Sequence, residues 1–297
     1  MQKTNMIAID FFNDERKPIN GICKHCERDN TNPAWCQLCD PSKMTQETSG
    51  DKDIDKCIKE FQLKSTTYEG VIEWIPFNML ENIKPIGKGG FGTVYSAVWS
   101  YGKRIIEGNN DVGYARSRKR CEVALKTLSS PQTSSNFLTE FQNHMQCRLG
   151  GSELEIYGLT QNEDKDYLMI LQYAIRGNLH EFLQQNFRDI DFTWKKKLEQ
   201  LKDISHDLNR IHLKGYTHGD FHSGNILLDQ TLGGKIKSYI ADLGLSRKKD
   251  DNSNVEIFGV MPYVAPEVLS GQQFTPAADI YGFGAIMSEM STGQKTF

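Results

Sequence analysis

Three oxygen-bearing side chains lie near one another in the sequence and have the types that metal-assisted phosphoryl transfer requires. Asp220 and Asn225 are five residues apart in YTHGDFHSGNILL, and Asp242 follows in YIADLG. One carboxylate can orient an attacking hydroxyl group, while carboxylate and carboxamide oxygens can fix Mg²⁺ on phosphates. These residues therefore predict a phosphate-handling site.

A glycine-rich stretch, GKGGFGTV, offers a place for the phosphates. Gly87, Gly89 and Gly92 have GxGxxG spacing, and glycine lets the backbone approach a phosphate because it has no Cβ. The dinucleotide-binding form of this motif needs a helix after the glycines. Here the β-branched and aromatic sequence TVYSAVW follows and predicts a strand. We therefore expect the glycines at the tip of a hairpin over a triphosphate, and a dinucleotide oxidoreductase is excluded.

A cation beneath this hairpin is supplied by Lys126, which ends the predicted strand EVALK. Its ammonium group could bind phosphate oxygens, and Glu140 in the predicted helix NFLTEFQNHM could hold it in place. The alternative for Glu140 is an ordinary surface glutamate. The intervening polar stretch SYGKRIIEGNNDVGYARSRKR predicts a solvated loop, with a nucleic-acid or targeting contact as the alternative.

A longer element must deliver the chain to Asp220. The sequence TWKKKLEQLKDISHDLNRIHLKG has apolar residues at helical spacing and a glycine at its end. We expect a long amphipathic helix with one apolar face, which carries Trp194, Leu198, Leu201, Leu208 and Ile211.

The amino-terminal part contains a possible metal site of a different kind. Cys23, Cys26, Cys36 and Cys39 form two CxxC pairs separated by nine residues, which could complete a tetrahedral sulfur shell around Zn²⁺. His25 is a competing ligand, and four reduced cysteines in a flexible tail are the alternative. Because four protein ligands leave no open position, a bound zinc would be structural.

The segment after these cysteines is polar from Pro41 to Thr67 and predicts a linker. Within it, DIDKCIKEFQL predicts one short helix because its apolar residues repeat at helical spacing. That stripe consists of Ile54, Cys57, Ile58 and Phe61.

Composition limits the compartment and the partners. The 297 residues carry a formal net charge of −3, with both signs interspersed, so neither nucleic acid nor a membrane surface is an expected partner. No apolar run approaches the roughly 18 residues of a membrane span. The start lacks a signal-peptide core, and the seven cysteines are expected as thiols or metal ligands. A cytoplasmic location is predicted.

In the order GKGGFGTV, VALK, HGDFHSGN, DLG and APE, these motifs resemble those of eukaryotic protein kinases. The resemblance covers roughly residues 78–297, and DFHSGN and GVMPYVAPE are most similar to the tyrosine-kinase-like group. It implies an α+β, two-lobed protein-kinase-like fold. Residues 78–174 would form the β-rich N-lobe and hinge, and residues 175–297 the mainly helical C-lobe. Residues 1–40 would hold the zinc knuckle and residues 41–77 the linker.

The resemblance also implies roles for individual residues. Asp220 would be the catalytic base, and Lys126 with Glu140 the catalytic ion pair. Asn225 and Asp242 would be the Mg²⁺ ligands. The implied ATP-binding residues, with Leu171 as gatekeeper, are Gly87, Lys88, Gly89, Gly90, Phe91, Gly92, Val94, Ala124, Lys126, Gln172, Ala174 and Leu227.

Several residues depart from the family pattern. Gly219 replaces the arginine before the catalytic aspartate, which removes the usual partner of a phosphorylated activation segment. His222 stands where serine/threonine kinases usually carry a lysine, so a slower enzyme is expected. Val260 occupies the place of a threonine that commonly bonds the catalytic aspartate, so hydroxyl specificity is weakly marked.

The chain stops at STGQKTF, where the family continues through further helices. The central helix, DIYGFGAIMSEM, is therefore expected to expose apolar side chains that a partner or a second copy covers, and Glu267 to lack its usual arginine. Asp279 of this helix is expected to hydrogen-bond the catalytic loop.

The leading prediction is a kinase that uses ATP and Mg²⁺ to phosphorylate serine or threonine hydroxyls of a protein substrate, with tyrosine not excluded. The alternative is a weakly active or inactive pseudokinase, an ATP-binding interaction module. The short C-lobe favours the alternative. The presence of Lys126, Asp220, Asn225 and Asp242 opposes it.

Overall fold

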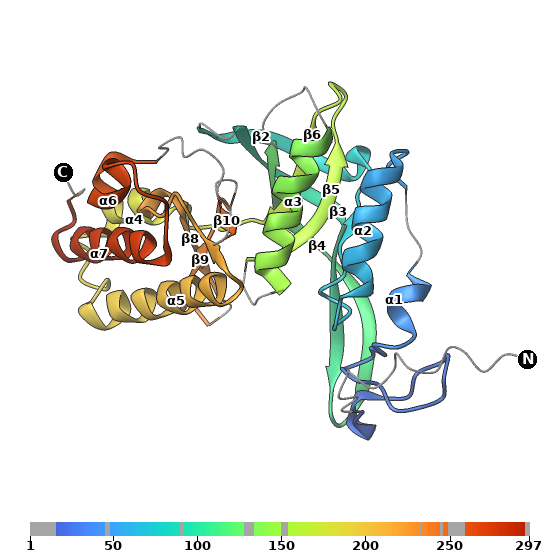
Figure 1. The fold of residues 1–297 in the computed structure, drawn as a ribbon. Coiled ribbons are helices and arrows are strands. Elements are labelled where there is room, and N and C mark those ends of the chain that lie inside the picture. The colour runs from blue at the N-terminus through green and yellow to red at the C-terminus, as the bar shows by residue number, and fades with distance from the viewer. Residues whose placement is uncertain are drawn as a thin grey trace, which may run out of the picture. The chain divides into compact units, whose positions relative to one another are not determined.

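The computed structural model describes residues 16–44, 48–89, 92–127, 134–149, 154–231, 233–243, 246–248 and 259–294. The chain forms two compact units, whose elements Figure 1 traces by colour. The first comprises Met1–Glu81, Val98–Cys121 and Tyr157–Thr160, and the second comprises Asn82–Ala97, Glu122–Ile156 and Gln161–Phe297. None of the described helices combines the length and the hydropathy needed to span a bilayer.

The amino-terminal part of the first unit contains the 3-10 helices η1 (Pro18–Asn20) and η2 (Phe77–Met79), helices α1 (Asp40–Lys43) and α2 (Lys52–Leu63), and strand β1 (Glu73–Trp74). Helix α2 begins where the Asp51 carboxylate accepts hydrogen bonds from the backbone N–H groups of Asp53 and Ile54. The predicted helix and its apolar stripe are confirmed. The buried side chains are Ile54, Cys57, Ile58 and Phe61.

A six-stranded sheet has the order β1-β5-β6-β4-β3-β2. Its other strands are β2 (Leu80–Gly89), β3 (Gly92–Asn109), β4 (Gly113–Thr127), β5 (Ile156–Gln161) and β6 (Tyr167–Gln172). Strand β1 pairs in parallel with β5, and β4 pairs antiparallel with β6. As predicted, the glycine-rich stretch joins two neighbouring strands, with Gly87 and Gly89 at the end of β2 and Gly92 at the start of β3.

The polar stretch over residues 100–120 is not a loop, and that prediction was wrong. It continues β3 to Asn109 and begins β4 at Gly113, so the two strands form a long hairpin. A polar composition predicts a solvent-exposed loop only when the polar side chains have no oppositely charged partners elsewhere in the fold. Here Arg104 and Arg118 of the hairpin bind the Glu73 carboxylate of the same unit, which compensates for their burial.

The second unit carries most of the helices. These are α3 (Ser134–Leu149), α4 (Leu179–Asn186), α5 (Trp194–Leu213), α6 (Pro266–Leu269) and α7 (Pro276–Thr292). The short strands are β7 (Tyr216–Thr217), β8 (Ile226–Gln230), β9 (Ile236–Ile240) and β10 (Arg247–Lys248), and the 3-10 helices are η3 (Ser223–Asn225) and η4 (Met261–Tyr263). Strand β8 pairs with β9, and β10 pairs with β7.

Helix α5 forms as predicted, but its apolar face is shorter than expected. Leu201, Leu208 and Ile211 are buried, whereas Trp194 and Leu198 are each 59% exposed. In this first turn, Lys197 packs inward instead, with its ammonium 3.9 Å from the centre of the Phe187 ring. A long lysine side chain thus covers apolar surface that the leucine was expected to cover.

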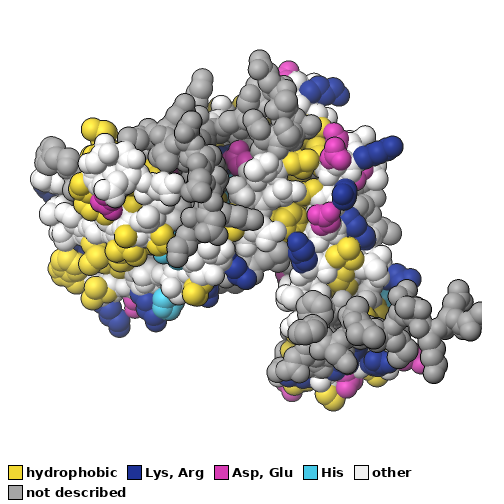
Figure 2. All heavy atoms as spheres, viewed as in Figure 1, with side chains coloured by type: hydrophobic (Ala, Val, Ile, Leu, Met, Phe, Trp, Pro, Cys, Tyr) yellow, Lys and Arg dark blue, Asp and Glu magenta, His cyan; other side chains and the backbone are white. Residues whose placement is uncertain are grey.

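The core of the second unit joins α4, α5, α7 and the loop that carries Asp220. On α7, Ile286 and Met290 are fully buried, whereas Ile280, Tyr281 and Met287 are roughly half exposed. Figure 2 shows hydrophobic side chains gathered over this helix. The expected exposure of apolar side chains on α7 is therefore present, and the sheet with its helices confirms the α+β class.

Candidate active site

The ammonium group of Lys126 lies between two carboxylates of the second unit. Its Nζ is 3.3 Å from Glu140 Oε1 on α3 and 2.6 Å from Asp242 Oδ1, just after β9. Lys126 is 6% exposed, so the attraction acts with little screening by water. Burial raises the pKa of Glu140 above its ordinary value, against the opposing effect of Lys126. One cation and two carboxylates leave this group with a surplus negative charge that would favour a further cation.

The glycine hairpin is held against the strand that carries Lys126. The backbone N–H of Thr93 donates to Thr127 Oγ1 over 2.7 Å. Gly92 has φ of +124°, and a Cβ there would meet the Thr127 carbonyl oxygen at 2.6 Å, so this position requires glycine. Val94 and Ala124 are partly buried nearby in the same sheet.

Not every predicted nucleotide contact can be placed. Gly90, Phe91 and the side chain of Lys88 lie outside the described residues. Gly87 and Gly89 belong to β2. Their assignment to ATP remains a prediction.

The loop that carries Asp220 is anchored by α7, as predicted. The Asp279 carboxylate is 1% exposed and accepts hydrogen bonds from the backbone N–H groups of His218, at 2.8 Å, and Gly219, at 3.1 Å. It also lies 2.8 Å from His212 Nε2. Gly219 has φ of +80°, where a side chain would be strained. The glycine that replaces the expected arginine therefore relieves backbone strain next to Asp220.

Asn225 fixes the position of Asp220. Its Nδ2 donates to the Asp220 backbone carbonyl at 2.9 Å and to Asp220 Oδ2 at 3.1 Å. Because its NH₂ group is used in this way, the Asn225 carbonyl oxygen is oriented away from Asp220 as an acceptor. With the Asp242 carboxylate, this gives the hard oxygen donors that suit Mg²⁺, so the residues fit the metal that the sequence predicts.

His222 also faces Asp220. Its Nδ1 accepts a hydrogen bond from the Gly224 backbone N–H at 3.0 Å, so in the neutral ring Nε2 carries the proton. Nε2 lies 3.5 Å from Asp220 Oδ2. The neutral imidazole can therefore direct its Nε2–H toward the Asp220 carboxylate.

The residues predicted to meet adenine lie around the end of β6. Leu171 and Ala174 are each 8% exposed. The Gln172 backbone N–H donates to the Glu155 carbonyl, and its side chain donates to Asp229 Oδ2 at 2.7 Å. Leu227 pairs with Tyr239 across β8 and β9 and is partly buried. All belong to the second unit, with Lys126 and Asp220.

Sequence reasoning missed His144, which lies one helical turn after Glu140. It is 4% exposed, and its Nε2 has no hydrogen-bond partner in the described part of the chain. Burial, with a further contribution from Lys126, lowers the pKa of His144 to about 3. Glu140, His144 and Asp242 bring their ligand atoms within 4.8 Å of one another. The spacing of four residues on one helix was the available signal.

Tyr263 and Glu289 form a second contact that the sequence did not indicate. The Tyr263 hydroxyl donates to Glu289 Oε2 at 2.6 Å and lies 3.1 Å from Ser223 Oγ. His180 Nδ1 is 2.7 Å from the other oxygen of Glu289. Burial raises the pKa of Tyr263. This network ties the segment before α6 to the Asp220 loop and to α7.

The four predicted zinc ligands of the first unit come together. The sulfur atoms of Cys23, Cys26, Cys36 and Cys39 all lie within 4.8 Å of one another, and those of Cys26 and Cys36 are 3.9 Å apart. Zinc–sulfur bonds of about 2.3 Å in a tetrahedron place sulfur atoms about 3.8 Å apart, so the cluster fits zinc. His25 is exposed and lies outside the cluster.

Neighbouring groups act unequally on these thiols. The backbone N–H of Arg28 lowers the pKa of Cys26 to about 7, whereas burial raises the pKa of Cys39 to about 12. The backbone N–H of Cys36 donates to Asp40 Oδ2 at 2.6 Å. That buried carboxylate also binds Arg116 at 2.6 Å, which links the cluster to the hairpin of the same unit.

Comparison with known proteins gives one family and many relatives. The family model described as protein tyrosine and serine/threonine kinase matches residues 80–297. The chain is 28% identical over 209 residues to a protein from Dictyostelium discoideum named as a probable serine/threonine-protein kinase, covering 70% of this chain and 20% of that relative.

Several relatives come from Arabidopsis thaliana, among them two receptor-like kinases. The cysteine-rich receptor-like protein kinase 2 is 25% identical over 266 residues, covering 87% of this chain and 37% of its own. A G-type lectin S-receptor-like serine/threonine-protein kinase is 28% identical over 223 residues, covering 71% and 24%. The chain thus spans well under half of the length of these relatives.

Proposed function

The chain belongs to the protein tyrosine and serine/threonine kinase family, and we propose that it transfers the γ-phosphate of ATP to serine or threonine hydroxyls of a protein substrate with the help of Mg²⁺. Its fold is α+β and protein-kinase-like, with a β-sheet N-lobe and a helical C-lobe. The wording of DFHSGN and GVMPYVAPE supports assignment to the tyrosine-kinase-like group. Relatives named as serine/threonine kinases support the choice of acceptor.

The observation that carries the proposal is the presence of two polar groups, built from five side chains, in one unit. Lys126 binds Asp242 and Glu140, and Asn225 binds Asp220. If the Lys126 ion pairs were only structural, the same unit would not also need the Asp220–Asn225 pair, whose residue types are those that phosphoryl transfer uses.

Each of these residues has a task in the proposed reaction. Asp220, oriented by Asn225, would accept a hydrogen bond from the acceptor hydroxyl and then its proton as the oxygen attacks the γ-phosphorus. The bond from this phosphorus to the β,γ-bridging oxygen breaks, and ADP leaves. Lys126 would bind α- and β-phosphate oxygens, and Glu140 would hold the ammonium in place. Asn225 and Asp242 would hold Mg²⁺, which when bound neutralises charge on the phosphate oxygens.

The amino-terminal part has a separate proposed role. We assign residues 1–40 to a structural zinc knuckle because the four sulfur atoms have zinc-compatible spacing. Residues 41–77, expected to be a linker, instead bury apolar side chains within the first unit. Cysteines at metal-ligand spacing favour a reducing compartment, which supports a cytoplasmic location.

The test is phosphate transfer from ATP to a generic protein substrate, measured for the chain and for Asp220→Asn. The substitution keeps the shape but removes the base, so we expect transfer to fall at least about a hundredfold. The matched control is Asp191→Asn, the same chemical change at an exposed position of the second unit, which should retain full transfer.

Nucleotide binding separates the outcomes of this experiment. ATP with Mg²⁺ should raise the melting temperature of both the chain and Asp220→Asn. Binding without transfer in the unmodified chain would replace the kinase with a nucleotide-binding pseudokinase. Equal transfer by Asp220→Asn would refute the assignment of the base.

A further inference from the structure

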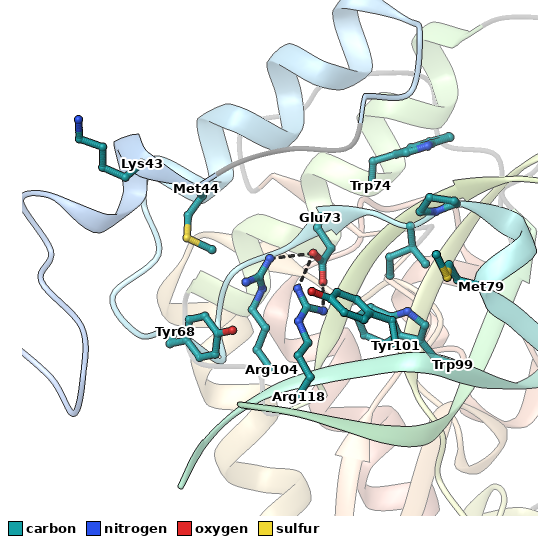
Figure 3. Close-up of a pocket in the computed structure, with 12 residues that line it drawn as sticks. Lys43, Met44, Tyr68, Glu73, Trp74, Met79, Trp99, Tyr101, Arg104 and Arg118 are labelled. Carbon is teal, nitrogen blue, oxygen red and sulfur yellow. Dashed lines mark hydrogen bonds and ion pairs between the residues drawn. The ribbon is translucent and has the colours of Figure 1, made fainter. Parts of the chain in front are cut away.

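A cavity of about 410 Å³ lies within the first unit (Figure 3). Its walls come from α1 and the residue after it, from β1 to η2, and from the hairpin strands β3 and β4. A volume of this size is within the range of small-ligand sites. The proposed kinase chemistry uses none of its lining residues.

The charges in the cavity are unbalanced. The Glu73 carboxylate accepts hydrogen bonds from Arg104 at 2.7 Å and from both terminal nitrogens of Arg118 at 2.6 and 2.8 Å. The side chain of Arg104 is 8% exposed, that of Arg118 is 15% exposed and that of Glu73 is 16% exposed. Two largely buried guanidinium groups therefore share one carboxylate. Lys43 at the cavity rim adds a third cation, which is exposed and points away from Glu73 in Figure 3. Buried cations in excess favour an anionic ligand.

Arg104 has fewer acceptors than its donors require. A guanidinium group offers five N–H donors in a rigid fork. Arg104 donates a hydrogen bond to Glu73. The buried Nε of Arg104 has no hydrogen-bond partner in the part of the chain that the structure describes. The face of the group is instead covered by the Tyr68 ring, 5.2 Å away. A ligand with several oxygen atoms would supply acceptors at this position.

The other half of the cavity is aromatic and apolar. Figure 3 shows Lys43, Met44 and Tyr68 on one side of Glu73, and Met79, Trp99 and Tyr101 on the other, whereas the Trp74 side chain points away from the Glu73 carboxylate. Tyr101 packs on Arg118, with the ring centre 4.2 Å from the guanidinium carbon. Tyr101 and Met79 are 59% and 40% exposed, so an apolar surface remains open next to the cations. The ligand should therefore combine an anion with a flat apolar group.

We propose that this cavity binds a phosphotyrosine side chain of another protein. Three cations and one carboxylate give the wall a formal charge of +2, which matches the charge of about −1.5 to −2 on a phosphate monoester. Arginine binds phosphate through two N–H groups at once. The phenyl ring would contact Tyr101 and Met79, whereas phosphoserine has no ring to make these contacts.

The test is direct binding of a fluorescent phosphotyrosyl peptide to the full chain in the absence of ATP. We expect binding at least about tenfold tighter than that of the phosphoseryl counterpart, because the ring contact is lost in the latter. The unphosphorylated peptide should not bind. Equal affinity for the phosphoseryl peptide, or displacement of the phosphotyrosyl peptide by AMP or inorganic phosphate at equal concentration, would overturn the proposal.

Variants locate the binding in the cavity. Arg104→Lys keeps the charge but removes the fork and should weaken binding about tenfold or more. Lys43→Glu and Tyr101→Ala alter exposed side chains and should each weaken binding several-fold without lowering the melting temperature. The matched control is Lys56→Glu on the exposed face of α2, outside the cavity. Unchanged affinity in both Lys43→Glu and Tyr101→Ala would refute the site.

Discussion

In the candidate active site, the buried Nε2 of His144 has no hydrogen-bond partner among the residues that the structure describes. Leaving a buried polar atom without a hydrogen bond costs about 1–3 kcal/mol. The nearest carboxylate oxygen, Glu140 Oε1, is 4.0 Å away, too far for a hydrogen bond. His144 therefore lowers the stability of the fold at a position next to Lys126 and Asp242, and residues of functional sites commonly have this effect.

We predict that His144→Leu stabilises the second unit by about 1 kcal/mol at neutral pH, because it removes the unpaired nitrogen at similar volume. The gain should grow as the pH falls from about 6.5 toward about 3. In that window the unfolded histidine binds a proton that the folded His144, with its pKa of about 3, does not bind. Unfolding curves across this pH range measure both effects.

His206→Leu on α5 provides the control for this prediction, because His206 is exposed. Its effect should stay within about 0.5 kcal/mol. A pH-independent difference between His144→Leu and the unmodified chain would show that the folded His144 titrates normally.

The amino-terminal part of the first unit packs against the long hairpin of β3 and β4. Arg116 of β4 reaches Asp40 at 2.6 Å and the Ala34 carbonyl at 2.8 Å, and its guanidinium lies over the rings of Trp35 and Tyr68. Arginine is suited to this position because one planar group can stack and donate several hydrogen bonds at once.

We predict that Arg116→Ala destabilises the first unit by about 1–3 kcal/mol, because it leaves the buried Asp40 carboxylate with one partner fewer. Arg120→Ala on the same strand is the matched control. Its ion pair with Glu81 is 2.8 Å long but exposed, so its loss should cost less than about 1 kcal/mol. Denaturant unfolding measures both variants. Equal losses would show that the Asp40 contact contributes no more than a surface ion pair.

At the scale of the whole molecule, the candidate binding sites are divided between the two compact units. The cysteine cluster and the cationic cavity belong to the first, and the residues assigned to ATP and Mg²⁺ belong to the second. A ligand that binds only the folded form of a unit stabilises that unit according to its concentration and affinity.

We predict that the purified chain carries about one zinc ion and that a chelator lowers the melting temperature of the first unit. ATP with Mg²⁺ should raise that of the second unit. Cys36→Ser should abolish zinc binding, whereas Cys121→Ser, outside the cluster, should retain it. Elemental analysis and calorimetry check these results. A Cys36→Ser chain with full zinc content would exclude the cluster as the metal site.

Local patterns in the sequence were sufficient for several features. The glycine hairpin, helix α2, and the separate motifs that contain Lys126, Asp220, Asn225 and Asp242 each depend on residues close together in the chain. Local spacing therefore predicted each of them, and their order along the chain resembles that of the family whose model matches residues 80–297.

Features that depend on distant partners were decided by the tertiary structure. Residues 100–120 seemed too polar for strands, but Glu73 and Asp40 pair with their arginines. Likewise, the pKa of His144 and the strain-free turn at Gly219 follow from burial and backbone angles. The sequence by itself determined which chemical groups this protein has and how they are ordered. Only the tertiary structure decided which of them are buried, paired or left without a partner, because desolvation and pairing depend on neighbours that are remote in the chain.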